Sequence, residues 1–195
     1  WMEFRTSGRI ADLLHLYGCD EVLTDQQVCK SEARMGVPEG GGMTGVIGML
    51  HCGMGPTVAL RFDIDALPVR ECEELDHFPA QEGFRSEHAG YMHACGHDGH
   101  ITVGLGTAKL LCQMREQLHG TIKFIFQPAE EGVRGARAIV ENGHLEDVDF
   151  LLAAHMYGGS EQHPCGICIT AGHGLATTKL DVDFHGKASH ARSEE

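Results

Sequence analysis

The sequence has few basic residues and no long hydrophobic run. Its 15 lysines and arginines stand against 28 aspartates and glutamates, which gives a formal net charge of −13 at pH 7. A surface that binds nucleic acid or an anionic membrane would carry clustered lysine and arginine, so this composition argues against both partners. No apolar stretch approaches the roughly 20 residues that cross a bilayer. We therefore expect a globular protein that binds neither nucleic acid nor a membrane.

Signals of export are also missing. Residues 1–5 lack the basic start and apolar core of a signal peptide. The eight cysteines are scattered over 195 residues, whereas secreted domains held by disulfides are usually shorter and more densely cross-linked. We expect a reduced, cytoplasmic protein in which most cysteines act as small buried apolar residues.

Hydrophobic periodicity predicts strands that alternate with helices. Apolar residues at a spacing of three and four positions indicate helices, and short apolar runs between turn residues indicate strands. Two of these runs, 45–51 and 57–62, are interpreted as a hairpin because only five residues join them. Alternating elements favour a layered α/β core. The other predicted elements are helices over 5–17, 99–117 and 133–142 and strands over 121–126 and 150–154.

Residues 92–100 read MHACGHDGH, which places three histidines, a cysteine and an aspartate within nine positions. Sulfur, imidazole and carboxylate are ligands that a borderline divalent ion such as zinc or manganese accepts. Cys95 and His97 directly precede a predicted helix, whose N-terminus favours a thiolate, so we expect a lowered pKa for Cys95. A single cysteine or histidine is more often a core residue, but the clustering of ligand types favours a metal site.

Two adjacent carboxylates, Glu130 and Glu131, follow the predicted strand 121–126. Neighbouring residues of an extended segment point in opposite directions, so we expect only one of the two to bind metal directly. The other would accept a proton from the attacking water and pass it to the leaving nitrogen. Taken alone, the pair would be interpreted as a solvated acidic start of a helix.

Further residues of types that bind metal follow predicted strands. Ligand-binding sites of α/β proteins usually lie at the carboxyl ends of the strands. His155 directly follows the strand 150–154, and Asp63 and Asp65 end the strand 57–62 with side chains expected on the same side. His93 and His100 flank the ligand block and could support the ligands or lie on the surface. Together the clusters predict metal-assisted hydrolysis.

At these motifs the chain resembles the M20 amidohydrolases, a family that includes hydrolases of aminobenzoyl-glutamate, hippurate and auxin conjugates. The resemblance extends over nearly the whole chain, and the cysteine–histidine block combined with the glutamate pair is specific. The blocks that carry it are RFDIDALP at 61–68, MHACGHDGH at 92–100, QPAEEG at 127–132, and the shorter segments 31–36, 135–138 and 176–179.

The resemblance implies a zinc-peptidase-like catalytic domain with a layered mixed sheet and two divalent ions, zinc or manganese. It implies that Cys95 bridges the two ions and that Glu130 is the general base. It also implies that His190 stabilises the oxyanion, reaching the site of a partner subunit, and that Asp65 lies beside the ligands without binding metal. The terminal metal ligands that it implies are His97, Glu131 and His155.

The resemblance also implies a division into a catalytic domain and a smaller α+β lid domain that forms dimers. We expect residues 1–174 to belong to the first and residues 175–195 to begin the second. The family has a further histidine ligand after the lid domain, beyond Glu195, so we expect the catalytic domain to be incomplete in these residues. A homodimer or hetero-oligomer formed through the lid domain is implied as well.

The implied activity is cleavage of the amide bond between an acyl or aroyl group and an amino acid, with p-aminobenzoyl-glutamate as the leading substrate. Arg134 and Lys179 are candidates for binding an acidic substrate. Three alternatives remain open: a broad deacylase of N-acyl amino acids, a metal-binding protein without turnover, and a thiol redox module. The last depends on Cys165 and Cys168 alone, and a single CxxC is weak evidence.

Overall fold

The computed structural model describes residues 1–74, 76–156, 166–167, 182–183 and 185–186. The chain divides into two units, Trp1–Pro164 and Cys165–Glu195, and all the helices and strands described below belong to the first. The residues around the expected domain boundary at 174 and 175 lie outside the described part, so this boundary stays a prediction.

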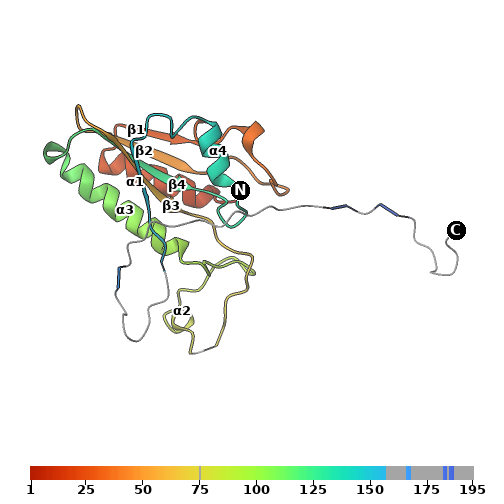
Figure 1. Cartoon of the computed structure of the whole chain (residues 1–195). Helices are drawn as coiled ribbons and strands as arrows, with labels where there is room; N and C mark the ends of the chain where they lie inside the picture. The colour runs from red at the N-terminus through yellow and green to blue at the C-terminus, as the bar shows by residue number, and fades with distance from the viewer. Residues whose placement is uncertain (75, 157–165, 168–181, 184, 187–195) are drawn as a thin grey trace, which may run out of the picture. The chain divides into compact units, whose positions relative to one another are not determined.

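A five-stranded mixed sheet forms the centre of the first unit (Figure 1). The strands occur in the order β1-β2-β4-β3-β5. β3 is parallel to β4 and to β5, whereas β2 is antiparallel to β1 and to β4. This arrangement confirms the α/β class and the mixed sheet. The bounds are Glu21–Thr24 (β1), Val46–His51 (β2), Thr57–Asp63 (β3), Thr121–Gln127 (β4) and Phe150–Ala153 (β5).

The predicted hairpin is wrong, although both of its strands exist. β4 lies between β2 and β3 and pairs with both, so Val46 opposes Phe126 on one side and Thr57 opposes Thr121 on the other. The connection between β2 and β3 passes the start of β4, where the Thr121 N–H donates to the Pro56 carbonyl at 3.0 Å. Two strand spacings are only about 10 Å, a distance that a five-residue connection spans easily. Nearness in sequence therefore did not decide the pairing.

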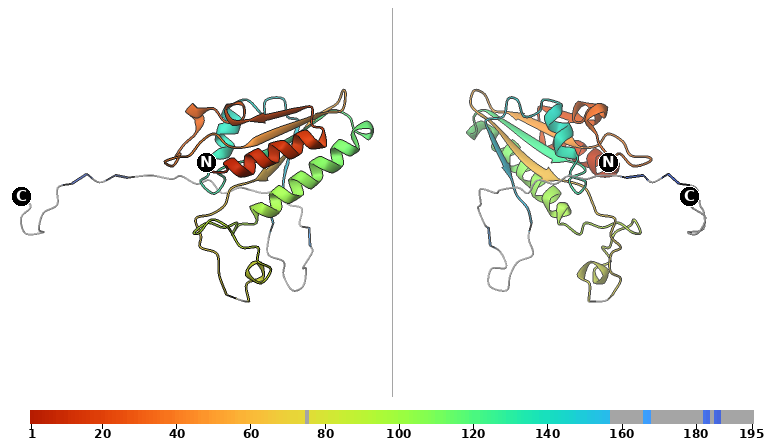
Figure 2. Two further views of the ribbon diagram at one scale, coloured as in Figure 1. Left: turned by 180° about the vertical axis from the view of Figure 1, so that it is seen from behind. Right: turned by 45° about the vertical axis from the view of Figure 1, so that its right-hand side comes forward.

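Helices cover both faces of the sheet. α1 (Phe4–Tyr17) and α3 (His97–Gln113) pack side by side on one face, and α4 (Gly135–Glu141) lies on the other (Figure 2). α1 ends at Gly18, whose φ of 90° is the left-handed conformation that glycine adopts most easily. All three predicted helices are confirmed, with α4 shorter than expected. The shorter helical segments are η1 (Asp25–Gln27), η2 (Ser31–Ala33), α2 (Phe78–Gln81) and η3 (Arg115–Gln117).

The core consists of one apolar cluster on each face of the sheet. β4 supplies both clusters because alternate residues of a strand point to opposite faces. On the face covered by α1 and α3, Phe124 and Phe126 pack against Leu14 and Ala108. On the face covered by α4, Ile125 packs with Ile139. The layers are thus held by burial of apolar side chains on both sides of a central strand.

The fold brings the ends of several elements to one edge of the sheet. β3, β4 and β5 are parallel, so the residues that follow them emerge at the same edge, and α3 begins there. Among the described residues, no helix is long and apolar enough to cross a membrane. The candidate site residues all lie at this edge, namely Asp63, Asp65, Cys95, His97, Glu130, Glu131 and His155.

Candidate metal centre

Cys95 and His97 stand at the start of α3 with Gly96 between them. Gly96 has a φ of 81°, a conformation that residues with a side chain rarely adopt. This turn places the half-buried Cys95 and the buried His97 on the same side of the chain, where both meet His155. The left-handed backbone conformation at Gly96 thus explains why a glycine stands at the centre of the Cys-Gly-His pattern.

The imidazole of His97 is fixed at one nitrogen and available at the other. Its Nδ1 lies 2.9 Å from the main-chain oxygen of Asp65 and 3.2 Å from Asp65 Oδ1. Because both partners only accept hydrogen bonds when the carboxyl is ionised, Nδ1 carries the proton and Nε2 keeps its lone pair. Nε2 is buried and has no hydrogen-bond partner. A metal-binding histidine has this arrangement, with its second nitrogen held by a carboxylate or a carbonyl.

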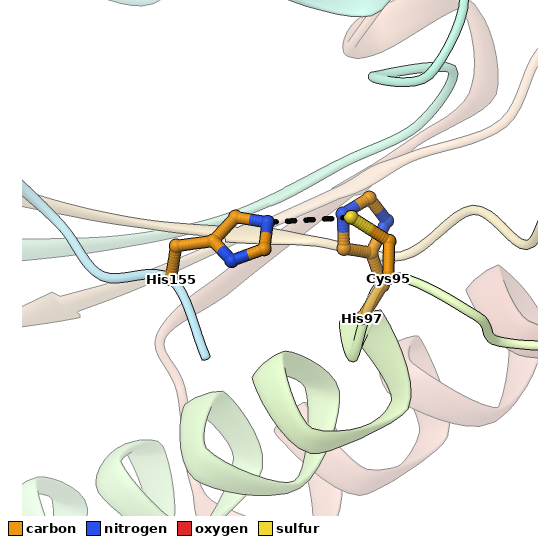
Figure 3. A group of neighbouring side chains, drawn as sticks. All are labelled: Cys95, His97 and His155. Atoms are coloured by element: carbon orange, nitrogen blue, oxygen red, sulfur yellow. Dashed lines mark hydrogen bonds between the residues drawn. The ribbon is translucent and has the colours of Figure 1, made fainter. Parts of the chain in front are cut away.

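His155 faces Cys95 across the site (Figure 3). Its Nε2 lies 3.5 Å from Cys95 Sγ, and its Nδ1 lies 2.8 Å from the Met156 carbonyl oxygen. The carbonyl requires a proton on Nδ1, so Nε2 is the acceptor that faces the thiol. One ligand atom each from Cys95, His97 and His155 lies within 4.8 Å of the others. The residues that bring these atoms together come from the start of α3 and from the chain after β5.

Glu130 and Glu131 lie in a tight turn and not in an extended segment. The Val133 N–H donates to the Glu130 carbonyl at 2.6 Å, and Ala129 and Val133 have φ angles of 51° and 56°. The expectation that the two carboxylates point in opposite directions is therefore wrong. One oxygen from each carboxylate and one nitrogen of His97 lie within 4.8 Å of one another. The carboxylate of Glu130 comes within 3.8 Å of His97 Nε2.

Asp65 connects these segments. Its Oδ2 accepts a hydrogen bond from the Glu131 N–H at 2.9 Å, while its other oxygens face His97. Asp63, at the end of β3, is also buried and lies 3.4 Å from His100 Nδ1 through its Oδ2. Burial raises the pKa of Asp63 to about 6, although the charges of Arg61 and His97 oppose this shift. Both aspartates therefore contact histidines of α3.

The electrostatics of Cys95 differ from the sequence prediction. Burial, the hydrogen bond with Glu131 and the negative charges of Glu131, Glu130 and Asp63 raise the pKa of the Cys95 thiol to about 11. The expected lowering of the Cys95 pKa by the helix N-terminus is wrong without a bound ion, because burial and the nearby carboxylates outweigh the helix end. A divalent ion would reverse this balance, since a coordinating thiol loses its proton outright.

The sequence left open whether His100 supports the ligands or lies on the surface. It is only 3% exposed, and burial together with the charges of His155, His97 and Arg61 lowers its pKa to about 4. One ligand atom each from Asp63, His97 and His100 also lies within 4.8 Å of the others. The i, i+3 spacing of His97 and His100 could have indicated a shared helix face, but not its burial.

Other predicted residues have different surroundings. Arg134 donates a hydrogen bond to the Gly36 carbonyl, so this candidate for substrate binding already has a partner. His190, Lys179 and the pair Cys165 and Cys168 lie outside the described residues. The sequence interpretation missed Glu3, whose Oε1 accepts the Ala129 N–H at 3.0 Å and so holds the turn that carries the two glutamates.

The donor set fits divalent metal ions. The sulfur, the imidazoles and the paired carboxylates gather around His97, whose Nε2 is buried without a hydrogen-bond partner. Leaving a buried polar atom unpaired costs about 1–3 kcal/mol, so such atoms usually mark a missing ligand or a functional role. Calcium and magnesium prefer ligand sets made of oxygen alone, so the sulfur and imidazole donors point to a different divalent ion.

Comparisons with known proteins agree with this chemistry. One subunit of the p-aminobenzoyl-glutamate hydrolase of Escherichia coli is 42% identical over 217 residues, covering 98% of this chain and 49% of that protein. The indole-3-acetyl-aspartic acid hydrolase of Enterobacter agglomerans has the same identity and coverage. The chain thus spans about half the length of the curated relatives it matches.

Among solved structures, the Bacillus subtilis YXEP protein, described as a dinuclear metal binding peptidase from the M20 family, has a TM-score of 0.64 and 39% identity. The match covers 78% of this chain and 37% of that one. The aminobenzoyl-glutamate utilization protein from Klebsiella pneumoniae has a TM-score of 0.61 and 35% identity, covering 80% of this chain and 39% of that one. Residues 59–194 match the family model directly. The chain therefore belongs to peptidase family M20/M25/M40.

Proposed function

We propose that the protein carrying this chain is a metal-dependent amidohydrolase. It cleaves the amide bond between an acyl or aroyl group and an amino acid, with p-aminobenzoyl-glutamate as the first substrate to test. The observation that carries this proposal is the convergence of Cys95, His155 and both glutamates on His97, whose buried Nε2 has no hydrogen-bond partner. Relatives that are named as hydrolases of aminobenzoyl-glutamate and of indole-3-acetyl-aspartate support the substrate class.

In this proposal Cys95, His97, Glu131 and His155 would hold two divalent ions, zinc or manganese, with Cys95 as the ligand common to both. Asp65 binds no metal but holds the proton on His97 Nδ1 and accepts the Glu131 N–H, and these contacts orient two ligands at once. Bound ions would acidify a water molecule and polarise the carbonyl of the substrate.

Glu130 is assigned as the general base. Its carboxylate lies 3.8 Å from His97 Nε2, near enough to the ligands to contact a water held among them. It takes a proton from the attacking water and delivers the proton to the leaving nitrogen, so that an amine departs and a carboxylic acid forms. A storage or structural metal site would have no use for such a carboxylate.

The proposal extends to residues outside the described part. His190 is assigned to the stabilisation of the oxyanion, reaching the site of a partner subunit in a homodimer or hetero-oligomer. Residues 1–174 are assigned to the catalytic domain and residues 175–195 to the start of the lid domain that forms this contact. The proposed compartment is the cytoplasm.

Glutamine substitutions at the two glutamates test the mechanism in the protein expressed from its complete gene. Removing a general base typically lowers the rate by about 10²–10⁴-fold, so Glu130→Gln should lower kcat by this factor and leave the metal content unchanged. Glu131→Gln should instead lower the metal content measured by elemental analysis. Full turnover by Glu130→Gln would contradict the assignment of the base.

A substrate panel separates the aroyl-glutamate hydrolase from a broad deacylase. The proposed function predicts a higher kcat/KM on p-aminobenzoyl-glutamate than on hippurate or acetylated amino acids. Equal values would favour the broad deacylase. If the metal-loaded protein turned over none of these compounds, the remaining alternative would be a metal-binding protein without this activity.

A further inference from the structure

His100 makes a contact that the proposed mechanism does not use. It lies one helical turn after His97 and is 3% exposed. Its Nε2 accepts a hydrogen bond from the Met156 N–H at 3.1 Å. The acceptor nitrogen of a neutral imidazole carries no proton, so the proton of His100 is on Nδ1. That nitrogen lies 3.4 Å from Asp63 Oδ2, which favours this tautomer.

The hydrogen bond between His100 and Met156 fixes the described residues after β5, which have no strand pairing with the sheet. The pairing of β5 with β3 ends at Ala153, opposite Arg61, so His155 lies two residues beyond the ladder. β5 itself is exposed along its whole length. Without a further anchor, the direction of the chain after β5 would be free to vary, and with it the position of the His155 imidazole.

α3 supplies that anchor. Besides the hydrogen bond to His100, the Met156 side chain lies over Gly99, where an added Cβ would overlap its thioether. The rings of His100 and His155 also meet edge to face, with centroids 4.6 Å apart. Because Cys95 and His97 belong to the start of the same helix, the segment is fixed relative to both.

We propose that His100 is a positioning residue, which fastens the chain after β5 to α3 so that His155 shares one metal centre with Cys95 and His97. Asp63 lies beside Nδ1, where its negative charge favours the proton although the two atoms make no hydrogen bond. The inference rests on the proposed function, in which His155 is a metal ligand. It adds a residue that binds neither metal nor substrate but sets the affinity of the centre.

His100 can affect metal affinity because it connects two separate elements that carry the proposed ligands. The helix start carries Cys95 and His97, and the end of an edge strand carries His155. One N–H···N hydrogen bond joins the two elements, one residue from His155 on the strand side and three residues from His97 on the helix side. Removing the acceptor would leave the Met156 N–H unpaired at a partly buried position and release the ligand segment.

Two substitutions at His100 differ in a single methylene and separate the contacts. The amide of His100→Gln reaches about as far as Nε2 and can accept the Met156 N–H. The amide of His100→Asn reaches only as far as Nδ1, so it keeps a polar group towards Asp63 and loses the acceptor for Met156. His15→Asn, on the exposed face of α1, controls for the loss of a histidine outside the site.

The test is a zinc titration of the metal-free protein, expressed from its complete gene, against a competing chelator. Loss of a partner that orients a ligand typically weakens metal binding by about 10- to 100-fold. We expect this loss for one of the two ions in His100→Asn and a change below about threefold in His100→Gln, well under that range. His15→Asn should bind like the unmodified protein. Urea unfolding of the metal-free proteins checks that both variants fold.

Equal metal affinity in the two variants, or failure of both to fold, would overturn the proposal for His100. The proposed function has a separate test in Glu131→Gln. If that variant loses metal while His100→Asn does not, only the positioning role fails. If neither variant affects metal binding, the metal centre itself is refuted.

Discussion

The packing of α3 on the sheet allows a sharp test at Gly104. An added Cβ at this position would lie 2.8 Å from atoms of both the Phe62 and the Phe126 rings. Carbon atoms prefer a separation of about 3.5–4.0 Å, so Gly104→Ala must move the helix or the rings by roughly 1 Å. The rings already contact each other, with centroids 5.4 Å apart, which limits how far they can yield.

The expected size follows from two opposing effects. Overpacking a core typically costs about 1–3 kcal/mol, and replacing glycine by alanine inside a helix returns about 1 kcal/mol. Gly104→Ala should therefore lower the free energy of unfolding by up to about 2 kcal/mol. Gly106, two residues further along the same helix, has no atom within 4 Å of an added Cβ. Gly106→Ala should therefore raise the free energy of unfolding by about 1 kcal/mol.

Urea unfolding of the two variants measures this difference, with equal m-values as the condition for comparing them. Since His97 begins α3 two turns before Gly104, a helix displaced from the sheet should also weaken metal binding at the proposed centre. Equal stabilisation by the two substitutions would refute the close contact between α3 and the two phenylalanine rings.

Two further predictions concern titratable groups away from the metal centre. Burial raises the pKa of the Cys29 thiol to about 12, so Cys29 should react with a disulfide reagent only after unfolding. The exposed Cys72 should react in the native protein. Equal reaction rates of the two thiols in the native protein would contradict this prediction. Burial lowers the pKa of His144 from its usual value of 6.5. As the pH falls through 6.5 the unfolded chain therefore binds more protons than the folded chain, and the free energy of unfolding should decrease between about pH 7.5 and pH 5.5. His144→Gln should flatten this slope in urea titrations at each pH, and an unchanged slope would show that another group causes it.

Local patterns predicted the elements of the fold but not their neighbours. Ile10 and Leu14 recur at helical spacing and are both buried in α1, so periodicity alone located this helix. The run 121–126 is apolar apart from Thr121 and Lys123 and became the central strand β4. The strand order could not be predicted in the same way. It depends on which strand buries both faces best, and that is a comparison between segments more than 60 residues apart.

At the candidate site, too, the sequence predicted which residue types occur but not how the backbone arranges them. The ligand types of Cys95 and His97 and their place before a helix were evident from the sequence. The turn at Glu130 was not, because Ala129 and Val133 adopt left-handed conformations that the sequence signals with neither glycine nor asparagine. A β-branched residue in this region is strained, and such strain persists only where the surroundings enforce it. At the other left-handed position of the turn, Ala129, the N–H donates to the Glu3 carboxylate.

The two aspartates and the two histidines form a matched set. Asp63 and Asp65 are two residues apart at a strand end, where each residue advances the chain by about 3.3 Å. His97 and His100 are three residues apart at a helix start, where each residue rises about 1.5 Å and three residues return to nearly the same face. The separations of about 6.6 Å and 4.5 Å are close enough for each carboxylate to face one imidazole.

The pairing runs in opposite directions along the two segments, since Asp65 contacts the earlier histidine and Asp63 the later one. The main-chain oxygen of Asp65 holds the proton on His97 Nδ1, whereas Asp63 lies beside His100 Nδ1 without a hydrogen bond. Nε2 of His97 has no hydrogen-bond partner among the described residues, as the proposed metal ligand requires, and Nε2 of His100 accepts the Met156 N–H. The motif D-x-D followed by H-x-x-H thus places each histidine beside one aspartate and leaves each with an acceptor nitrogen, one for the proposed metal ions and one for the Met156 N–H.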